Sequence, residues 1–169
     1  LREPLELGCI AISRANRKIT FPAKFQLIAA MNPCPCGYFN HPQKACTCSP
    51  SSVQKYLHKI SGPLLDRIDL QIEVVPISYE ELTSQEKIEN SNTIKNRVIK
   101  AREIQTDRFT HLANINTNAQ MQAADLKQWA FLDKASSSLL KLAMEQFHLS
   151  ARAHDRIIKV ARTIADLDG

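Results

Sequence analysis

Four cysteines lie within fifteen residues of one another and have the chemistry to hold a metal ion. They form two Cys-x-Cys pairs separated by nine residues: Cys34 with Cys36, and Cys46 with Cys48. Four thiolates can close a tetrahedral Zn²⁺ site and leave no open position for catalysis, so the pattern predicts a structural zinc. His41 and His58 are substitute ligands if one cysteine is not used. Four reduced, partly buried thiols are the alternative interpretation.

Asn32 and Arg67 stand where each could contact a phosphate. Asn32 ends an apolar run, and ligands of open α/β sheets bind beyond the carboxyl ends of the strands. A turn-forming Asn before a proline is the alternative. Arg67 could grip a phosphoryl oxygen, because a guanidinium is planar, always charged and bidentate. The alternative is a surface salt bridge, since Asp66 and Asp69 lie within two residues of Arg67.

Arg152 is expected in the first turn of the last helix, because Ser150 two residues earlier is a good N-cap. A positive charge in that turn opposes the helix dipole at a cost of roughly 0.3 to 1 kcal/mol. The placement therefore indicates an anionic partner, and a solvated arginine is the alternative.

No phosphate-binding loop accompanies these residues. The pattern Gly-x-x-x-x-Gly-Lys-Ser/Thr needs a glycine followed by lysine, and none of the four glycines in the chain is followed by one. The chain also has no apolar strand ending in Asp-Glu that could hold Mg²⁺. We therefore expect this chain alone to bind ATP poorly.

Hydrophobic patterning predicts an α/β part over residues 1–83 and an all-helical part over residues 84–169. Two short runs, 9–13 and 18–21, predict a β-hairpin with an exposed basic tip. Two apolar runs stopped by proline are typical of buried strands in a mostly parallel sheet: residues 25–31 and 70–75. Between them we expect a cysteine-rich insertion and two helices: residues 33–50, 51–59 and 63–68. A polar linker near residues 84–92 marks the boundary.

Composition indicates a soluble cytoplasmic protein. The 169 residues carry a net charge of +5, which permits contact with nucleic acid but does not demand it. No apolar run approaches the roughly 20 residues of a membrane-spanning helix. The first residues lack the pattern of a signal peptide, so we expect reduced cysteines and no membrane partner.

Taken together and in this order, these segments resemble the magnesium-chelatase-like AAA+ ATPase family, and specifically its bacterial competence-associated (ComM-type) members. The matching stretches span nearly the whole chain: LREPLE at 1–6, ISRA at 12–15, AMNPCPCG at 30–37, SGPLLDRIDL at 61–70, LSAR at 149–152 and ARTIADL at 161–167. The cysteine insertion favours the competence-type branch over the chelatase proper.

The resemblance implies a role for each polar residue singled out above. Asn32 would be the sensor-1 residue, Arg67 the arginine finger that reaches a neighbouring subunit's ATP, and Arg152 the sensor-2 arginine on a helical lid. Residues 14–18 would form the pre-sensor hairpin that lines a central pore, with Arg14, Arg17 and Lys18 on DNA.

The resemblance also implies an activity for the full-length protein: a hexameric ring that uses ATP and Mg²⁺ to translocate on DNA with branch migration. The phosphate loop of the family is missing here, so we expect the N-terminal half of the motor to lie outside this chain and the chain alone to be inactive as an ATPase. A chelatase-type motor that remodels a protein partner without nucleic acid is the competing hypothesis.

Overall fold

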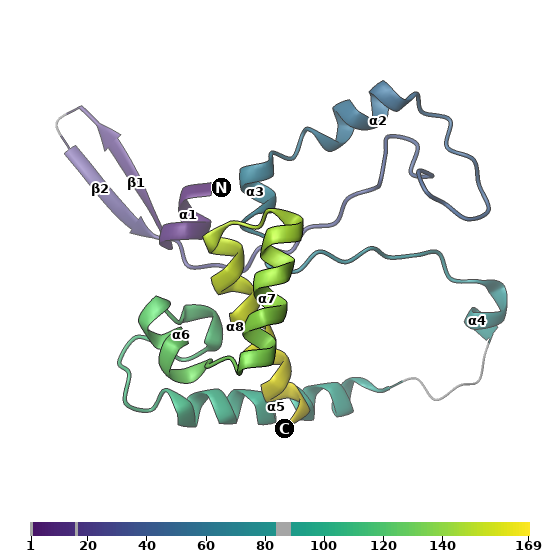
Figure 1. Ribbon diagram of the computed structural model, residues 1–169. Coiled ribbons are helices and arrows are strands. Elements are labelled where there is room, and N and C mark those ends of the chain that lie inside the picture. The colour runs from purple at the N-terminus through teal and green to yellow at the C-terminus, as the bar shows by residue number, and fades with distance from the viewer. Residues whose placement is uncertain (1, 16, 84–88) are drawn as a thin grey trace. The chain divides into compact units, whose positions relative to one another are not determined.

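The computed structural model describes residues 2–15, 17–83 and 89–169, which form two compact units (Figure 1). Unit 1 spans Leu1–Ser84 and unit 2 spans Gln85–Gly169. The first residues of the predicted linker, 84–87, lie outside the described residues. Its last residues are not linker: Asn90 caps helix α5 by accepting a hydrogen bond from the backbone N–H of Thr93 at 2.9 Å.

Unit 1 begins with a short helix and the predicted β-hairpin. Helix α1 (Arg2–Leu7) leads into strands β1 (Cys9–Arg14) and β2 (Arg17–Pro22). The strands pair antiparallel from Cys9 opposite Pro22 to Arg14 opposite Arg17, which leaves a two-residue connection. All six residues of β2 are exposed. The prediction of a hairpin is confirmed.

The predicted parallel sheet is not formed by the described residues. Residues 25–31 and 70–75 have no strand partner, and the hairpin is the sheet found in the described part of the chain. Ile28, Ile72 and Val74 are 84%, 81% and 87% exposed. A parallel strand buried on both faces needs neighbouring strands and covering helices, and without them these apolar runs cannot be buried.

The remaining helices of unit 1 are short. They are α2 (Pro50–Leu57), α3 (Gly62–Leu65) and α4 (Tyr79–Thr83). Helix α2 begins where Ser49 accepts a hydrogen bond from the backbone N–H of Ser52, with proline at its first position. The two helices predicted between the apolar runs are therefore confirmed, with slightly different ends.

Unit 2 is helical throughout its described residues, as predicted. Its elements are α5 (Ser91–Arg108), the 3-10 turn η1 (Asn118–Gln120), α6 (Ala123–Trp129), α7 (Lys134–Phe147) and α8 (Ala151–Asp168). Its core is built by five buried residues: Phe109, Met121, Leu126, Ala130 and Ile158. None of the helices in the described ranges is both long enough and apolar enough to cross a membrane.

The spacing of apolar residues predicts one buried face on α5, with Ile94, Val98 and Ala101, and one on α8, with Ile157, Ile158, Ala161, Ile164 and Ala165. These predictions are only partly correct. Ala101 and Ile158 are buried, but Ile94 and Val98 are 42% and 45% exposed, and Ile164 is 54% exposed. Helix α8 instead packs on α5 and η1 through a face that carries Asp166. The spacing of apolar residues therefore identifies only part of the buried face of α8, because polar residues such as Asp166 also contribute to it.

A buried ionic network joins three elements of unit 2. Asp166 is 3% exposed and accepts hydrogen bonds from Arg108 and from the side-chain amide of Asn118, each 2.7 Å to Oδ2. Arg162 lies 3.2 Å from the other oxygen. Burial by itself raises the pKa of Asp166, but the bonds from Arg108 and Asn118 and the charges of Arg108 and Arg162 outweigh it and hold the pKa below its usual value.

We expect Asp166→Ala to lower the free energy of unfolding of this chain by about 3–5 kcal/mol, because Arg108 is left as a buried, uncompensated charge. Asp168→Ala, at the exposed end of the same helix, is the control and should cost little. Urea unfolding followed by the fluorescence of Trp129, the single tryptophan, measures both. A cost below about 1 kcal/mol would contradict the network's role.

The same network predicts that the stability of the folded chain depends on pH. The folded pKa of Asp166 lies below its unfolded pKa, so the carboxylate contributes stability above the unfolded pKa. That contribution is lost as pH falls through the lower, folded pKa. Wild-type chain should therefore lose more stability than Asp166→Ala between neutral pH and about pH 3. Parallel pH profiles for the two proteins would contradict this.

Candidate functional site

The four predicted cysteines converge in the fold. Their Sγ atoms all lie within 4.8 Å of one another. The Sγ atoms of Cys34 and Cys36 are 3.3 Å apart. The Sγ of Cys46 lies 3.6 Å from that of Cys36 and 3.7 Å from that of Cys34. A tetrahedral zinc with bonds of about 2.3 Å places its sulfurs about 3.8 Å apart. We call these four residues the cysteine cluster, and its donor set and spacing fit Zn²⁺.

The loop around the cysteine cluster is shaped by local turns. Cys34 is fully buried, and its carbonyl accepts a hydrogen bond from the backbone N–H of Gly37 at 3.0 Å. Gly37 has a φ of 84°, in the left-handed region that glycine adopts without strain. Pro35 lies inside this turn, directly after Cys34, where its ring fixes φ at a value that suits a turn. This turn brings Cys34 and Cys36 to one side of the loop.

Electrostatics in the cysteine cluster favour a bound cation. Hydrogen bonds from the backbone of Tyr38 and Thr47 lower the pKa of Cys36 to about 5. The backbone of Cys48 acts to lower the pKa of Cys46, but burial and the neighbouring thiols raise it to about 12. The Cys36 thiol therefore ionises readily and the Cys46 thiol does not, because negative charges on neighbouring sulfurs repel each other. A divalent cation removes that repulsion and lets all four sulfurs ligate.

Neither histidine named as a substitute ligand belongs to the cysteine cluster. The Nδ1 of His41 instead accepts backbone hydrogen bonds from Gln43 and Lys44, each at 3.1 Å. His58 is the residue that ends helix α2.

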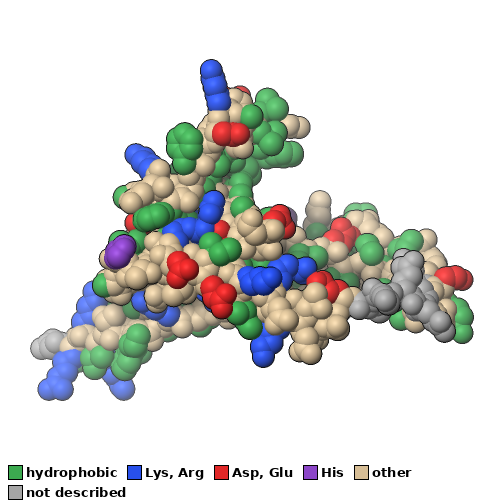
Figure 2. Space-filling view, turned by 90° about the horizontal axis from the view of Figure 1, so that it is seen from below, with side chains coloured by type: hydrophobic (Ala, Val, Ile, Leu, Met, Phe, Trp, Pro, Cys, Tyr) green, Lys and Arg blue, Asp and Glu red, His purple; other side chains and the backbone are tan. Residues whose placement is uncertain are grey.

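The hairpin tip concentrates positive charge. Arg14 and Arg17 are directly opposite each other in the ladder, and Lys18 is next to them, opposite Ser13. All three cations are exposed, and Figure 2 shows Lys and Arg side chains gathered at the tip, at the left-hand end of the view. Like charges directly opposite each other destabilise a strand pair, and an anion placed against the tip would relieve that repulsion.

Arg67 is held by a partner that the sequence did not reveal. Its guanidinium makes an ion pair with Glu6 of helix α1, 61 residues earlier, and donates to the carbonyl of Pro63. The side chain is 16% exposed. A salt bridge, the alternative considered for Arg67, is therefore present, and its partner Glu6 is distant in the sequence. No local pattern signals this pairing.

Asn32 and Arg152 are both exposed and lie in different units. Asn32 lies two residues before Cys34, at the start of the loop. Arg152 is the second residue of α8, whose first turn is capped by Ser150 through a 3.2 Å hydrogen bond from the backbone N–H of Ala153. The predicted N-cap is confirmed, and the roles of Asn32, Arg67 and Arg152 stay predictions.

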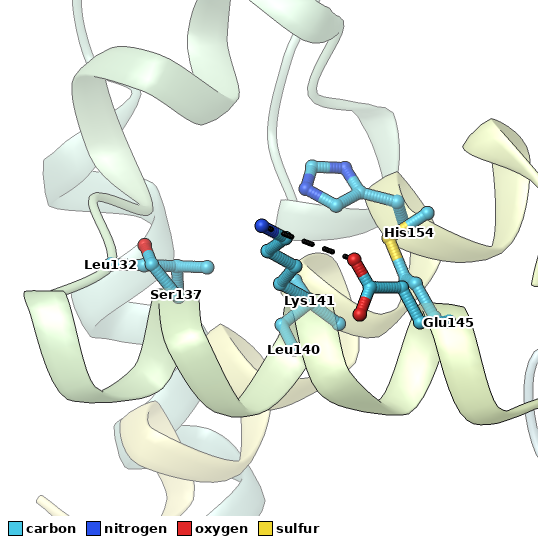
Figure 3. A pocket seen from close by; sticks show the side chains of 7 residues that line it. Leu132, Ser137, Leu140, Lys141, Glu145 and His154 are labelled. Atoms are coloured by element: carbon cyan, nitrogen blue, oxygen red, sulfur yellow. Dashed lines mark ion pairs between the residues drawn. The ribbon is translucent and has the colours of Figure 1, made fainter.

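A groove of about 430 Å³ lies in unit 2 (Figure 3). It is lined by residues of α7, α8 and the loop before α7: Leu132, Ser137, Leu140, Lys141, Met144, Glu145 and His154. Its lining is largely apolar, with Lys141 3.9 Å from Glu145. None of the predicted site residues lines it, so the groove and the predicted chemistry are separate.

Two family models match the chain in succession. The model described as magnesium chelatase, subunit ChlI, matches residues 1–82. The model described as magnesium chelatase, subunit ChlI C-terminal, matches residues 88–169. Together they account for nearly all of the sequence.

Curated relatives match the chain over its whole length. Competence protein ComM of Haemophilus influenzae is 42% identical over 170 residues, which cover 100% of this chain and 32% of that protein. Protein YifB of Escherichia coli is also 42% identical, over 99% of this chain and 32% of its own length. An uncharacterized protein of Mycobacterium tuberculosis is 36% identical over 169 residues, covering 100% of this chain and 33% of that protein.

The chain thus spans about a third of the length of the curated relatives it matches. The resemblance inferred from the sequence motifs is confirmed by both family models and by identity that extends over both units. The chain belongs to the magnesium chelatase subunit ChlI family and is similar to competence protein ComM throughout its length.

Proposed function

We propose that this chain is part of a cytoplasmic AAA+ ATPase that couples ATP hydrolysis to translocation on DNA, with branch migration. The observation that carries the DNA role is the hairpin tip, where Arg14 and Arg17 oppose each other and are exposed. Such a pairing costs stability unless an anion lies against it. The similarity to a competence protein supports the same proposal.

Within this proposal, three polar residues act on ATP. Asn32 orients the attacking water or touches the terminal phosphate, and Arg152 contacts the nucleotide from the helical unit. Arg67 supplies its planar guanidinium to the phosphate of a neighbouring subunit, where it stabilises the charge of the transferring group. This last role requires a homo-oligomer, which we propose is a hexameric ring. The groups that hold ATP and Mg²⁺ belong to other parts of the full-length protein.

The cysteine cluster has a structural role in this proposal. Cys34, Cys36, Cys46 and Cys48 hold one Zn²⁺, and four protein ligands leave it no position for substrate. The ion supplies order to a loop that has little apolar core of its own, with Cys34 its buried cysteine. The described part of the loop contains neither helix nor strand between residues 33 and 49.

A second candidate function is a chelatase-type motor that remodels a protein partner without nucleic acid. The observation that favours it is the family match itself, because both models are described by magnesium chelatase. The two functions differ in what stimulates ATP turnover: DNA in the first, and a protein partner in the second.

The experiment that tests the DNA role replaces the three cations of the hairpin tip. We expect Arg14→Ala/Arg17→Ala/Lys18→Ala in the full-length protein to abolish DNA stimulation of ATP turnover and keep turnover without DNA. A plot of log affinity against log salt concentration has a negative slope. The magnitude of this slope should decrease by about 2 to 3, since each lost phosphate contact removes about 0.7 to 0.9.

A matched control removes three exposed cations from unit 2: Lys127→Ala/Lys134→Ala/Lys141→Ala. It lowers the net charge equally but leaves the hairpin intact, so DNA stimulation should persist. DNA affinity that is the same in the hairpin variant, the control and the wild type would show that the hairpin is not the DNA contact.

A further inference from the structure

Positive charge is distributed unevenly along this chain. Residues 7–65 contain no Asp or Glu and seven of the 22 Lys and Arg residues, whereas the rest of the chain has more acids than cations. Only part of this charge belongs to the hairpin. Three cations lie in the cysteine-rich loop and in or just after helix α2: Lys44, Lys55 and Lys59. A zinc ion with four thiolates would offset only part of the positive charge of the stretch.

Aromatic rings accompany these cations. Tyr38 and Phe39 are adjacent in the loop and are 37% and 40% exposed. The Nζ of Lys44 lies 5.0 Å from the centroid of the Tyr38 ring. On the next element, the Nζ of Lys59 lies 5.6 Å from the centroid of Tyr56. In each pair, an aromatic ring on which a base could stack lies within a few ångströms of a lysine ammonium group that could bind a phosphate.

The loop holds its aromatic and cationic residues in a fixed arrangement. The rings of His41 and Tyr38 form a T-shaped pair, with 5.6 Å between their centroids. The Nδ1 of His41 also accepts the backbone N–H of Lys44, so one side chain positions both the ring and the cation beside it. The cysteine cluster lies on either side of this segment, at Cys36 and Cys46. Side chains that are already held in place lose little conformational entropy when a ligand binds.

We propose that the cysteine-rich loop and the end of helix α2 form a second DNA contact, distinct from the hairpin, that binds single-stranded DNA. Bases stack on Tyr38 and Phe39, and Lys44 and Lys59 neutralise neighbouring phosphates. The partner is single-stranded because the faces of bases are available only when they are unpaired. Its anionic backbone complements a stretch without acidic residues. This inference rests on the proposed DNA function and names a further site for it.

The test measures binding of a fluorescent oligothymidylate to the full-length, zinc-loaded protein over a range of salt concentrations. Tyr38→Ala/Phe39→Ala should weaken affinity by roughly tenfold or more and leave the salt slope unchanged, because rings carry no charge. Lys44→Ala/Lys59→Ala should decrease the magnitude of the salt slope by about 1.4. Affinity for blunt duplex DNA should be kept by the ring variant.

The matched control removes two rings from elsewhere: Tyr79→Ala/Phe131→Ala, which are 76% and 83% exposed. It should bind oligothymidylate like the wild type, and an unchanged zinc content shows that the loop variants keep their fold. If the hairpin variant loses DNA binding and the ring variant binds like the control, this inference is overturned while the DNA function stands. If the wild-type protein binds no DNA, both are overturned.

Discussion

Arg67→Ala in the full-length protein should lower ATP turnover by about 10³-fold or more and leave ATP binding nearly unchanged. An arginine finger stabilises negative charge that develops on the phosphate only in the transition state, so its loss slows hydrolysis without weakening the binding of ATP. The measurement pairs steady-state hydrolysis with the affinity for a fluorescent ATP analogue. Arg67→Lys should restore little, because a point charge does not replace the planar, bidentate guanidinium.

The ion pair between Arg67 and Glu6 supplies a control for misfolding. Glu6→Gln removes the same ion pair but keeps the guanidinium, so it should retain far more turnover than Arg67→Ala. Comparable losses in both variants would assign Arg67 to the packing of α1 instead of to ATP. Normal turnover in Arg67→Ala would show that Arg67 is not the arginine finger.

Removal of zinc should be the largest stability effect in unit 1. Zinc binding to comparable sites is worth on the order of 10 kcal/mol or more, so its loss should unfold the cysteine-rich loop. We expect about one zinc per chain in protein never exposed to chelator, and rapid amide exchange over residues 33–50 after chelation. Hydrogen exchange and metal analysis measure the two effects.

Single substitutions localise the metal. Cys34→Ser and Cys46→Ser should each lose most of the bound zinc, whereas Cys9→Ser should keep it because Cys9 lies outside the cysteine cluster. Less than about half an equivalent of zinc in the untreated wild-type protein would mean that the cysteines are simply reduced thiols.

Features governed by neighbouring residues could be predicted from the sequence. The hairpin followed from two short apolar runs around a polar tip, and the N-cap at Ser150 followed from its preference for that position. The cysteine cluster also followed from spacing, because two Cys-x-Cys pairs across a nine-residue loop can fold onto one ion. Each of these signals is contained within a few residues.

Features that depend on distant partners could not be predicted in this way. Arg67 pairs with Glu6 across 61 residues, and Arg108 pairs with Asp166 across 58. Polar residues such as Asp166 are expected at the surface, and nothing local indicates that this one is buried. The apolar run at 70–75 has the composition of a buried strand, but burial depends on neighbouring strands that the described residues do not supply.

The rate of ATP hydrolysis by the full-length protein, with and without DNA, tests the central claim most directly. We predict that single-stranded or branched DNA raises the turnover of the wild-type protein severalfold, and that Arg67→Ala abolishes turnover under both conditions. A wild-type rate that is unchanged by saturating DNA, and that rises instead with a protein partner, would contradict the account of a DNA motor.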